Sequence, residues 1–428
     1  MGDVHEARHS VSVDTIGDTV ANPHTYADPA ACHALFTRLR AEAPVRWTTP
    51  ATTRPFWLLS RHADILEVER QPEVFLSGPR LELFSREQEA AIQAAHAGRS
   101  AVSRTVLHMD GAEHRSYRGI TQGWFMSARL KKLEQGLDEL AKEYVDALAA
   151  NGGDADFVAT VAVWYPLRVI LMILGLPPGE APHLLRLTRN FVGRDLPEAK
   201  PADGKRENIL VDAAQEIFGY FRDVYRDRLK HPRDDLASVI AHATIDGRPI
   251  EDLEAMSYYL LIGLAGHDTT SSTLSGGLLA LIENPAEHAK LCANPELLAL
   301  AADEMLRWVS PVRSFMRTAD RDYRLRDQEI QAGQALLMSF PSANRDEAVF
   351  AQPSAFKVDR KPNAHIAFGY GAHVCLGQFL ARMELRALFR ELLSRLESVE
   401  LSGTTAWLPG ITSGSLTRLP IRYRLRSA

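Results

Sequence analysis

One cysteine lies in a glycine-rich segment that could hold a metal-bound thiolate. Residues 365–380 read HIAFGYGAHVCLGQFL, with three glycines around Cys375. Glycines let a loop fold tightly and direct backbone N–H groups at a sulfur atom, and such hydrogen bonds tune a metal thiolate. A lone cysteine cannot hold zinc or an iron–sulfur cluster, which need several ligands, but it can supply the axial ligand of a haem iron. Taken alone, a cysteine such as Cys375 is more often an ordinary buried thiol in a glycine-rich turn.

A helix is predicted directly after this cysteine. Apolar residues recur at three- and four-residue spacing over residues 376–396. The sulfur would then face the free N–H groups and the positive dipole end of the helix, an environment that favours thiolate.

A second candidate site is the hexapeptide AGHDTT at residues 265–270, inside a helical pattern over about residues 251–282. Ala265 and Thr269 share a face at i, i+4, and the Thr269 hydroxyl can bond to the Ala265 carbonyl beside a glycine that leaves room. This predicts a groove for dioxygen and water. Asp268 could pass protons into the groove, although the tripeptide alone also fits a polar helix face with a satisfied carboxylate.

The elements around these motifs indicate an α+β chain. Residues 44–49 and 56–60 resemble a β-hairpin, residues 323–340 and the segment after residue 399 resume a β pattern, and helical patterns dominate between them. Strands at both ends of a helical middle predict one domain closed by distant pairing. Residues 1–22 are polar and aperiodic, which predicts a mobile arm, and residues 194–208 predict a mobile connection between helices.

Composition excludes several classes of protein. A formal net charge of −5 is not the basic excess of a nucleic-acid binder. The three cysteines are far apart and form no CxxC pair, which favours a reducing cytoplasm over a disulfide framework. The N-terminus has no apolar signal segment, and no apolar run is long enough to span a bilayer, so we expect a cytoplasmic protein without a membrane partner.

The segment FGYGAHVCLG resembles the haem-binding loop of the cytochrome P-450 family at every defining position: Phe368, Gly371, Cys375 and Gly377. AGHDTT is similar to the family's central helix above the haem. The resemblance covers nearly the whole chain from residue 23. It implies a mainly α fold with small β-sheets, formed as a single triangular domain over residues 23–428 with a long central helix.

The resemblance also implies roles for residues. Cys375 would be the axial ligand of haem b, and Asp268 and Thr269 would deliver protons to the reacting oxygen. Cofactor contacts would come from His114, Arg118, Ala265, Arg317, Phe368, Gly369, His373 and Gly377. The substrate pocket would include Leu261, Leu264, Val312 and Arg313, although Arg313 could also point outward. Glu304 and Arg307 would be a structural pair tied to residues 356–360.

The implied activity is a monooxygenase that takes O2 and two electrons, inserts one oxygen atom into a C–H bond and releases the other as water. The electrons would come from a separate ferredoxin and its NAD(P)H-dependent reductase. A basic docking patch could comprise Arg115, Arg129, Lys131, Lys132, Arg382 and Arg386, or these could be scattered surface charges.

The runs PVRSFMRTA and PSANRDEAVF are particularly similar to the bacterial branch typified by the α-terpineol hydroxylase. A small hydrophobic substrate, a monoterpenoid or compact alkyl-aromatic compound, and a monomeric protein are therefore expected. Two alternatives remain: a haem peroxygenase that consumes peroxide, and a haem sensor without catalysis. The acid–alcohol pair argues against the first, and a proton relay would be unnecessary for the second.

Overall fold

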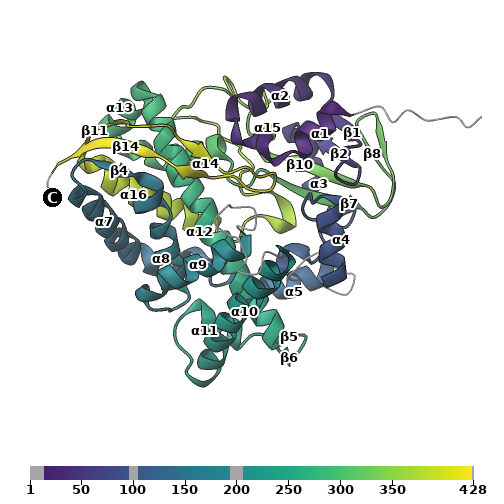
Figure 1. The fold of residues 1–428 in the computed structure, drawn as a ribbon, viewed down its shortest axis with the longest axis horizontal. Coiled ribbons are helices and arrows are strands. Elements are labelled where there is room, and N and C mark those ends of the chain that lie inside the picture. The colour runs from purple at the N-terminus through teal and green to yellow at the C-terminus, as the bar shows by residue number, and fades with distance from the viewer. Residues whose placement is uncertain (1–13, 96–104, 193–205, 427–428) are drawn as a thin grey trace, which may run out of the picture.

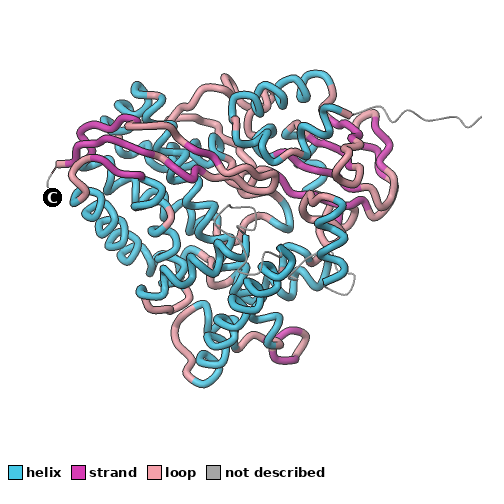
Figure 2. The backbone as a smooth tube through the Cα atoms, in the orientation of Figure 1, coloured by secondary structure: helices cyan, strands magenta, loops and turns pink. Residues whose placement is uncertain are grey.

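The protein is described by a computed structural model that covers residues 14–95, 105–192 and 206–426. Helices make up most of this part of the chain, and most strands gather in small sheets at two corners of a roughly triangular outline, with one short hairpin at the third (Figures 1 and 2). The predicted fold class, mainly α with small β-sheets, is confirmed. None of the described helices is long and apolar enough to cross a membrane.

The α-helices divide between the two halves of the chain. Those before residue 193 are α1 (Thr15–Ala21), α2 (Pro29–Glu42), α3 (His62–Glu69), α4 (Arg86–Ala95), α5 (Gly111–Gln122), α6 (Ser127–Leu130), α7 (Glu134–Ala150), α8 (Trp164–Ile173) and α9 (Ala181–Val192). Those after residue 205 are α10 (Arg206–Lys230), α11 (Leu236–Ala241), α12 (Asp252–Glu283), α13 (Pro285–Ala293), α14 (Leu298–Val309), α15 (Phe340–Ala343) and α16 (Gln378–Arg395).

The long helix α12 crosses the middle of the molecule (Figure 1) and carries AGHDTT near its centre. Its 32 residues span roughly 48 Å at 1.5 Å per residue. A capping box of Glu251 and Glu254 starts it, and Asn284 ends it. Helices α8, α10, α14 and α16 pack around α12, so α12 is buried along most of its length and holds one wall of the site in place.

The larger sheet joins segments from both ends of the chain. Its strand order is β1 (Val45–Thr48), β2 (Phe56–Leu59), β10 (Ala335–Ser339), β7 (Ser314–Ala319) and β3 (Phe75–Leu76). The predicted hairpin is β1 and β2, and β2 pairs in parallel with β10, so that Leu58 lies opposite Leu337. The predicted pairing between distant segments is thereby confirmed. It also places β7, which carries Arg317, beside the N-terminal strands.

The other strands form a three-stranded sheet and short hairpins. The sheet contains β11 (Leu396–Leu401), β14 (Pro420–Leu425) and β4 (Asp154–Asp156), and the hairpins contain β5 (Thr244–Ile245), β6 (Arg248–Pro249), β8 (Tyr323–Leu325), β9 (Gln328–Ile330), β12 (Ala406–Trp407) and β13 (Leu416–Arg418). The strands predicted over residues 323–340 and after residue 399 are therefore present.

The predicted boundary of a mobile N-terminal arm is wrong for residues 14–22. The Asp14 carboxylate accepts hydrogen bonds from the N–H groups of Gly17 (3.0 Å) and Thr49 (2.9 Å), which caps α1 and ties it to the β1–β2 turn. Val20 is fully buried. Residues 1–13 lie outside the described residues, as do residues 194–205 of the predicted mobile connection, while α10 already begins at Arg206.

Candidate active site

The Cys375 loop is held by its backbone. The Cys375 N–H donates to the Phe368 carbonyl at 2.9 Å, and a 3-10 turn over Gly371–His373 lies between them. Gly371 has a φ of +67°, and a Cβ there would lie 2.2 Å from the Glu69 carbonyl oxygen at the end of α3. Only glycine allows this conformation and this approach, so the loop is pinned against α3.

The Cys375 side chain is exposed, but it faces an internal cavity that it helps to line. Burial within the protein raises the pKa of the thiol, opposed by the Gly377 N–H and by Arg118 and Arg382. The predicted thiolate-favouring environment is therefore wrong for the thiol by itself. The first residue of α16 is Gln378, three residues after Cys375, so the helix dipole acts on the sulfur from further away than expected. Coordination to a metal would itself stabilise the deprotonated sulfur.

Beside the cysteine, basic side chains of helix α5 lie against the Cys375 loop. His114 on α5 and His373 in the loop stack with ring centroids 4.1 Å apart. Arg118, one turn after His114, donates to the Val374 carbonyl at 2.6 Å, and both Arg118 and His373 line the cavity. Burial lowers the pKa of both imidazoles, that of His373 to about 2, so both rings are neutral near pH 7.

These residues fit a doubly anionic cofactor. The buried Nε2 of His114 has no hydrogen-bond partner among the described residues, and such an unpaired polar atom is costly unless a ligand satisfies it. The Arg118 guanidinium offers further donors on the same side. A haem whose carboxylate arms reach this region would satisfy both groups, and Cys375 stands in the same cavity to bind iron.

The Arg317 guanidinium already has partners within the protein, so a cofactor would share it with them. Its Nη2 lies 2.6 Å from Oε1 of the buried Glu69, and its Nη1 donates to the Met316 carbonyl. Sequence reasoning missed Glu69, because nothing in the surrounding residues distinguishes the last acid of α3 from a solvated one. Its burial depends on strand β7 and the Cys375 loop arriving from distant parts of the chain.

The opposite wall is the middle of α12. The Thr269 hydroxyl donates to the Ala265 carbonyl at 2.8 Å, as predicted, and Ala265, Gly266 and Thr269 line the cavity. The room expected beside Gly266 is filled from behind: a Cβ there would lie 2.2 Å from Cδ1 of Ile170 on α8. The glycine therefore lets α8 approach α12 closely, which is a packing role rather than a widened groove.

Asp268 is not among the described residues that line the cavity. It pairs with His267 instead. Asp268 Oδ1 lies 3.1 Å from His267 Nε2, and His267 Nδ1 lies 2.7 Å from the Gly263 carbonyl. A carbonyl can only accept, so Nδ1 carries the proton and Nε2 carries one only in the imidazolium. Burial opposes this charge, but Asp268 raises the pKa of His267, and His267 lowers the pKa of Asp268 against the effect of burial. The hexapeptide contained this histidine, but its side-chain direction was not predicted.

The predicted substrate-pocket residues are split by the structure. Leu261 and Val312 line the cavity, with further apolar walls from Phe125, Ile170, Ile173 and Phe315. Leu264 does not line it, since Leu261, Ala265 and Thr269 follow each other at i, i+4 and position 264 falls off that face. Arg313 does not line it either. The Arg313 guanidinium donates to the Gly410 carbonyl at 2.7 Å and stacks on the Tyr26 ring. The side chain is therefore buried against these residues and not in the cavity.

Glu384 is a further buried group that sequence reasoning missed. It lines the cavity nine residues after Cys375, and burial raises the pKa of its carboxyl well above the usual value. An acid inside an otherwise apolar helical stripe was the available signal.

The structure places the two members of the predicted structural pair in contact. Glu304 and Arg307 are fully buried, with Arg307 Nε donating at 2.7 Å and Nη2 at 2.8 Å to the two carboxylate oxygens. Glu304 also accepts from Arg360 Nε (2.9 Å) and the Lys357 N–H (2.9 Å), the segment anticipated from the sequence. Arg307 donates to the Asn344 carbonyl, and the Asn344 side chain accepts from the Ile366 N–H. The pair thereby supports the start of the Cys375 loop.

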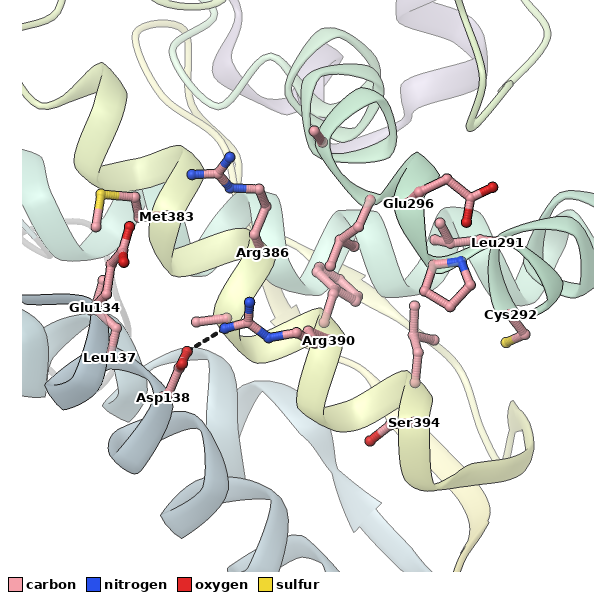
Figure 3. Close-up of a pocket in the computed structure, with 16 residues that line it drawn as sticks. Glu134, Leu137, Asp138, Leu291, Cys292, Glu296, Met383, Arg386, Arg390 and Ser394 are labelled. Carbon is pink, nitrogen blue, oxygen red and sulfur yellow. Dashed lines mark hydrogen bonds and ion pairs between the residues drawn. The ribbon is translucent and has the colours of Figure 1, made fainter. Parts of the chain in front are cut away.

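A second cavity shows that volume alone does not identify the site. It measures about 480 Å³, against about 230 Å³ for the cavity at Cys375. It lies between α7, α13, α14 and the outer face of α16 (Figure 3). Asp138 and Arg390 form an ion pair across it, and of the predicted site and docking residues only Arg386 is in its described lining. Cys292 lines this cavity, but among its described lining residues there is no glycine-rich loop around the cysteine and no threonine on a facing helix.

The chain is similar to several known proteins. The family model for cytochrome P450 matches residues 196–426. Cytochrome P450-terp of a Pseudomonas species is 37% identical over 95% of this chain and 97% of its own length. Linalool 8-monooxygenase of Pseudomonas putida is 32% identical over 89% and 92% of the two chains.

Solved structures agree with these matches. The crystal structure of CYP108D1 from Novosphingobium aromaticivorans DSM12444 has a TM-score of 0.90 at 35% identity, over 96% of this chain and 99% of that one. The Mycobacterium marinum cytochrome P450 CYP268A2 in complex with pseudoionone has a TM-score of 0.85 at 30% identity, with the same coverage. A cysteine loop facing a mid-helix threonine across one cavity, together with these matches, shows that the chain belongs to the cytochrome P450 family of haem-thiolate monooxygenases.

Proposed function

We propose that this protein hydroxylates a small hydrophobic compound, a monoterpenoid or a compact alkyl-aromatic molecule, with electrons from a separate ferredoxin. The observation that carries the proposal is the single cavity with Cys375 on one wall, Ala265 and Thr269 on the other, and apolar side chains over most of the rest. Similarity to cytochrome P450-terp, to linalool 8-monooxygenase and to a P450 complexed with pseudoionone supports the substrate class. The protein would act as a monomer in the cytoplasm.

The proposed cofactor is haem b, with Cys375 as its iron ligand and donors from His114, Arg118, His373 and Arg317 for its carboxylate arms. Phe368, Gly369 and Gly377 would border it on the cysteine side, and Ala265 on the other. When bound, the thiolate-ligated haem supplies O–O bond cleavage. Leu261, Val312 and Phe315 would orient the substrate and exclude water.

Protons would enter through α12. Asp268 has a side chain 55% exposed and paired with His267, and it directly precedes Thr269 in the chain. In our proposal Asp268 takes protons from water, and the Thr269 hydroxyl, already donating to the Ala265 carbonyl, accepts a hydrogen bond within the cavity and holds a water there. Domain boundaries and these roles remain predictions.

Ferredoxin would dock on the face behind Cys375. Phe379, in the first turn of α16, is 54% exposed and Tyr370, in the loop, is 40% exposed. Of the predicted basic patch, Arg129 is paired with Asp234 and Arg382 with Asp303. The other members have no ion-pair partner among the described residues: Arg115, Lys131, Lys132 and Arg386. Cations without an ion-pair partner, together with exposed aromatic side chains, suit an acidic iron–sulfur protein.

The proposal is tested in two steps with purified holoprotein. First, the dithionite-reduced protein is treated with carbon monoxide, where a strongly red-shifted Soret band reports cysteinate ligation. Second, terpenoids and alkyl-aromatic compounds are screened for spin-state shifts, and binders are incubated with NADH, a surrogate ferredoxin and its reductase. Hydroxylated product supports the proposal. Product from peroxide alone would indicate the peroxygenase, and a red-shifted band without turnover under any condition would favour the sensor.

A further inference from the structure

Glu69 connects two parts of the cofactor side of the cavity. It is the last residue of α3, and its side chain is 2% exposed. One carboxylate oxygen lies 2.6 Å from Arg317 Nη2 on β7, and the other accepts the Tyr370 N–H of the Cys375 loop at 3.2 Å. Glu69 also lines the cavity that contains Cys375. One buried carboxylate therefore holds both a cation and the ligand loop.

The charges around Glu69 are unevenly balanced. Among the described residues that line the cavity, the cations are Arg118 and Arg317, and the Glu69 carboxylate forms an ion pair with Arg317. A haem brings two carboxylate arms, so three carboxylates would share two guanidinium groups. The Asp110 carboxylate, 3.9 Å from His373 Nε2, adds to this excess of negative charge.

An uncompensated negative charge in a buried site disfavours the arrival of an electron. Charge–charge interactions are strong where water is excluded, and the potential of a haem responds to nearby charge and hydrogen bonding. Glu69 is therefore placed to act on the iron without touching it.

We propose that Glu69 is a positioning residue that holds Arg317 on the cofactor side and, through its negative charge, lowers the reduction potential of the bound iron. The inference rests on the proposed haem site. In the step concerned, one electron from an external donor converts ferric to ferrous iron, and no bond to Glu69 forms or breaks. A purely structural Glu69 would tie α3, β7 and the loop together but would leave the potential unchanged.

The test is a spectroelectrochemical titration of the substrate-free holoprotein and Glu69→Gln at one pH and ionic strength. Glutamine keeps the size of the side chain and an acceptor for the Tyr370 N–H, but loses the charge. We expect a more positive midpoint, with at least a tenfold higher ferrous-to-ferric ratio at the wild-type midpoint, or about 59 mV for one electron. The matched control is Glu67→Gln on the exposed face of the same helix, where the midpoint stays at the wild-type value.

An unchanged or more negative midpoint in Glu69→Gln would overturn the inference. If that variant does not retain haem, Arg317→Gln is compared with the double variant Glu69→Gln/Arg317→Gln: removal of the acid must move the midpoint to a more positive value, and any other result overturns the inference. The carbon monoxide spectrum of the wild-type protein distinguishes a failure of the proposed haem site from a failure of the role proposed for Glu69. Without a red-shifted band the proposed haem-thiolate site itself fails, whereas with the band only the role of Glu69 is in question.

Discussion

The two walls of the cavity are built in different ways. On the Cys375 wall, a backbone hydrogen bond within the loop and the left-handed conformation of Gly371 come from the motif itself, and the same glycine lets the loop pack against α3. On the α12 wall, the helix is regular, and its polar side chains take different partners: His267 contacts the Gly263 carbonyl and Asp268, while Thr269 donates to the Ala265 carbonyl. A sequence motif therefore predicts more of the Cys375 wall than of the α12 wall.

Replacing the cysteine should have the largest effect of any single change. Cys375→Ser removes the soft sulfur ligand, so the red-shifted carbon monoxide band should disappear and turnover should fall by more than about 100-fold. The matched control is Cys292→Ser on α13, which lines the second cavity instead. Both variants are compared by absorption spectra and product formation. A Cys375→Ser protein that keeps the wild-type band would remove the basis for the whole comparison.

Stability should depend strongly on the buried pair behind the loop. Arg307→Ala leaves the fully buried Glu304 without two of its donors, and such a loss costs about 3–5 kcal/mol of unfolding free energy. Arg390→Ala, which breaks an exposed pair with Asp138, should cost less than about 1 kcal/mol. Urea unfolding measures both. Similar losses for the two variants would mean that burial does not distinguish these pairs.

The sequence predicted the fold and the loop wall well, and the reasons are local. The hairpin at β1 and β2, the helix α12 and the Glu304 contacts follow from alternation, helical spacing and a motif with fixed intervals. Glu69 and Arg313 were missed or misplaced because their partners lie in distant parts of the chain. Leu264 and the His267–Asp268 pair were misplaced or missed because the orientation of α12 relative to the cavity was not predicted. Arg313, for example, turns away from the cavity because carbonyls near residue 410 and the ring of Tyr26 satisfy its guanidinium.

On the helix wall, Thr269→Ala should uncouple electron use from product formation. Removing the hydroxyl leaves the walls apolar, so haem and substrate binding should stay within about twofold of wild type, while product per NADH should fall by about tenfold and peroxide should rise. Ser275→Ala removes the same kind of helical back-bond, from Ser275 to the Ser271 carbonyl, outside the described cavity lining and should stay coupled. Tight coupling in Thr269→Ala would contradict the assigned role.

The smallest expected effect concerns the pair behind Thr269. His267 has a raised pKa, so its contribution to stability is present below the unfolded value of about 6.5 and is lost as the pH rises through the folded value. Asp268 has a lowered pKa, so its contribution is lost only in acid, below about pH 3.9. Because the Asp268 side chain is 55% exposed, the pair should contribute at most about 1 kcal/mol.

His267→Gln should therefore destabilise the protein more at about pH 5.5 than at about pH 9, since only the imidazolium attracts the Asp268 carboxylate. Urea unfolding of wild type, His267→Gln and Asp268→Asn at both pH values makes the comparison. The two variants should lose the same pH-dependent part of the stability, because each removes one member of the pair, and Arg189, the other charge that acts on both residues, stays in place. A destabilisation that is equal at the two pH values would mean that the contact does not depend on a charged His267, and the α12 wall would then be as fixed by its backbone as the Cys375 loop.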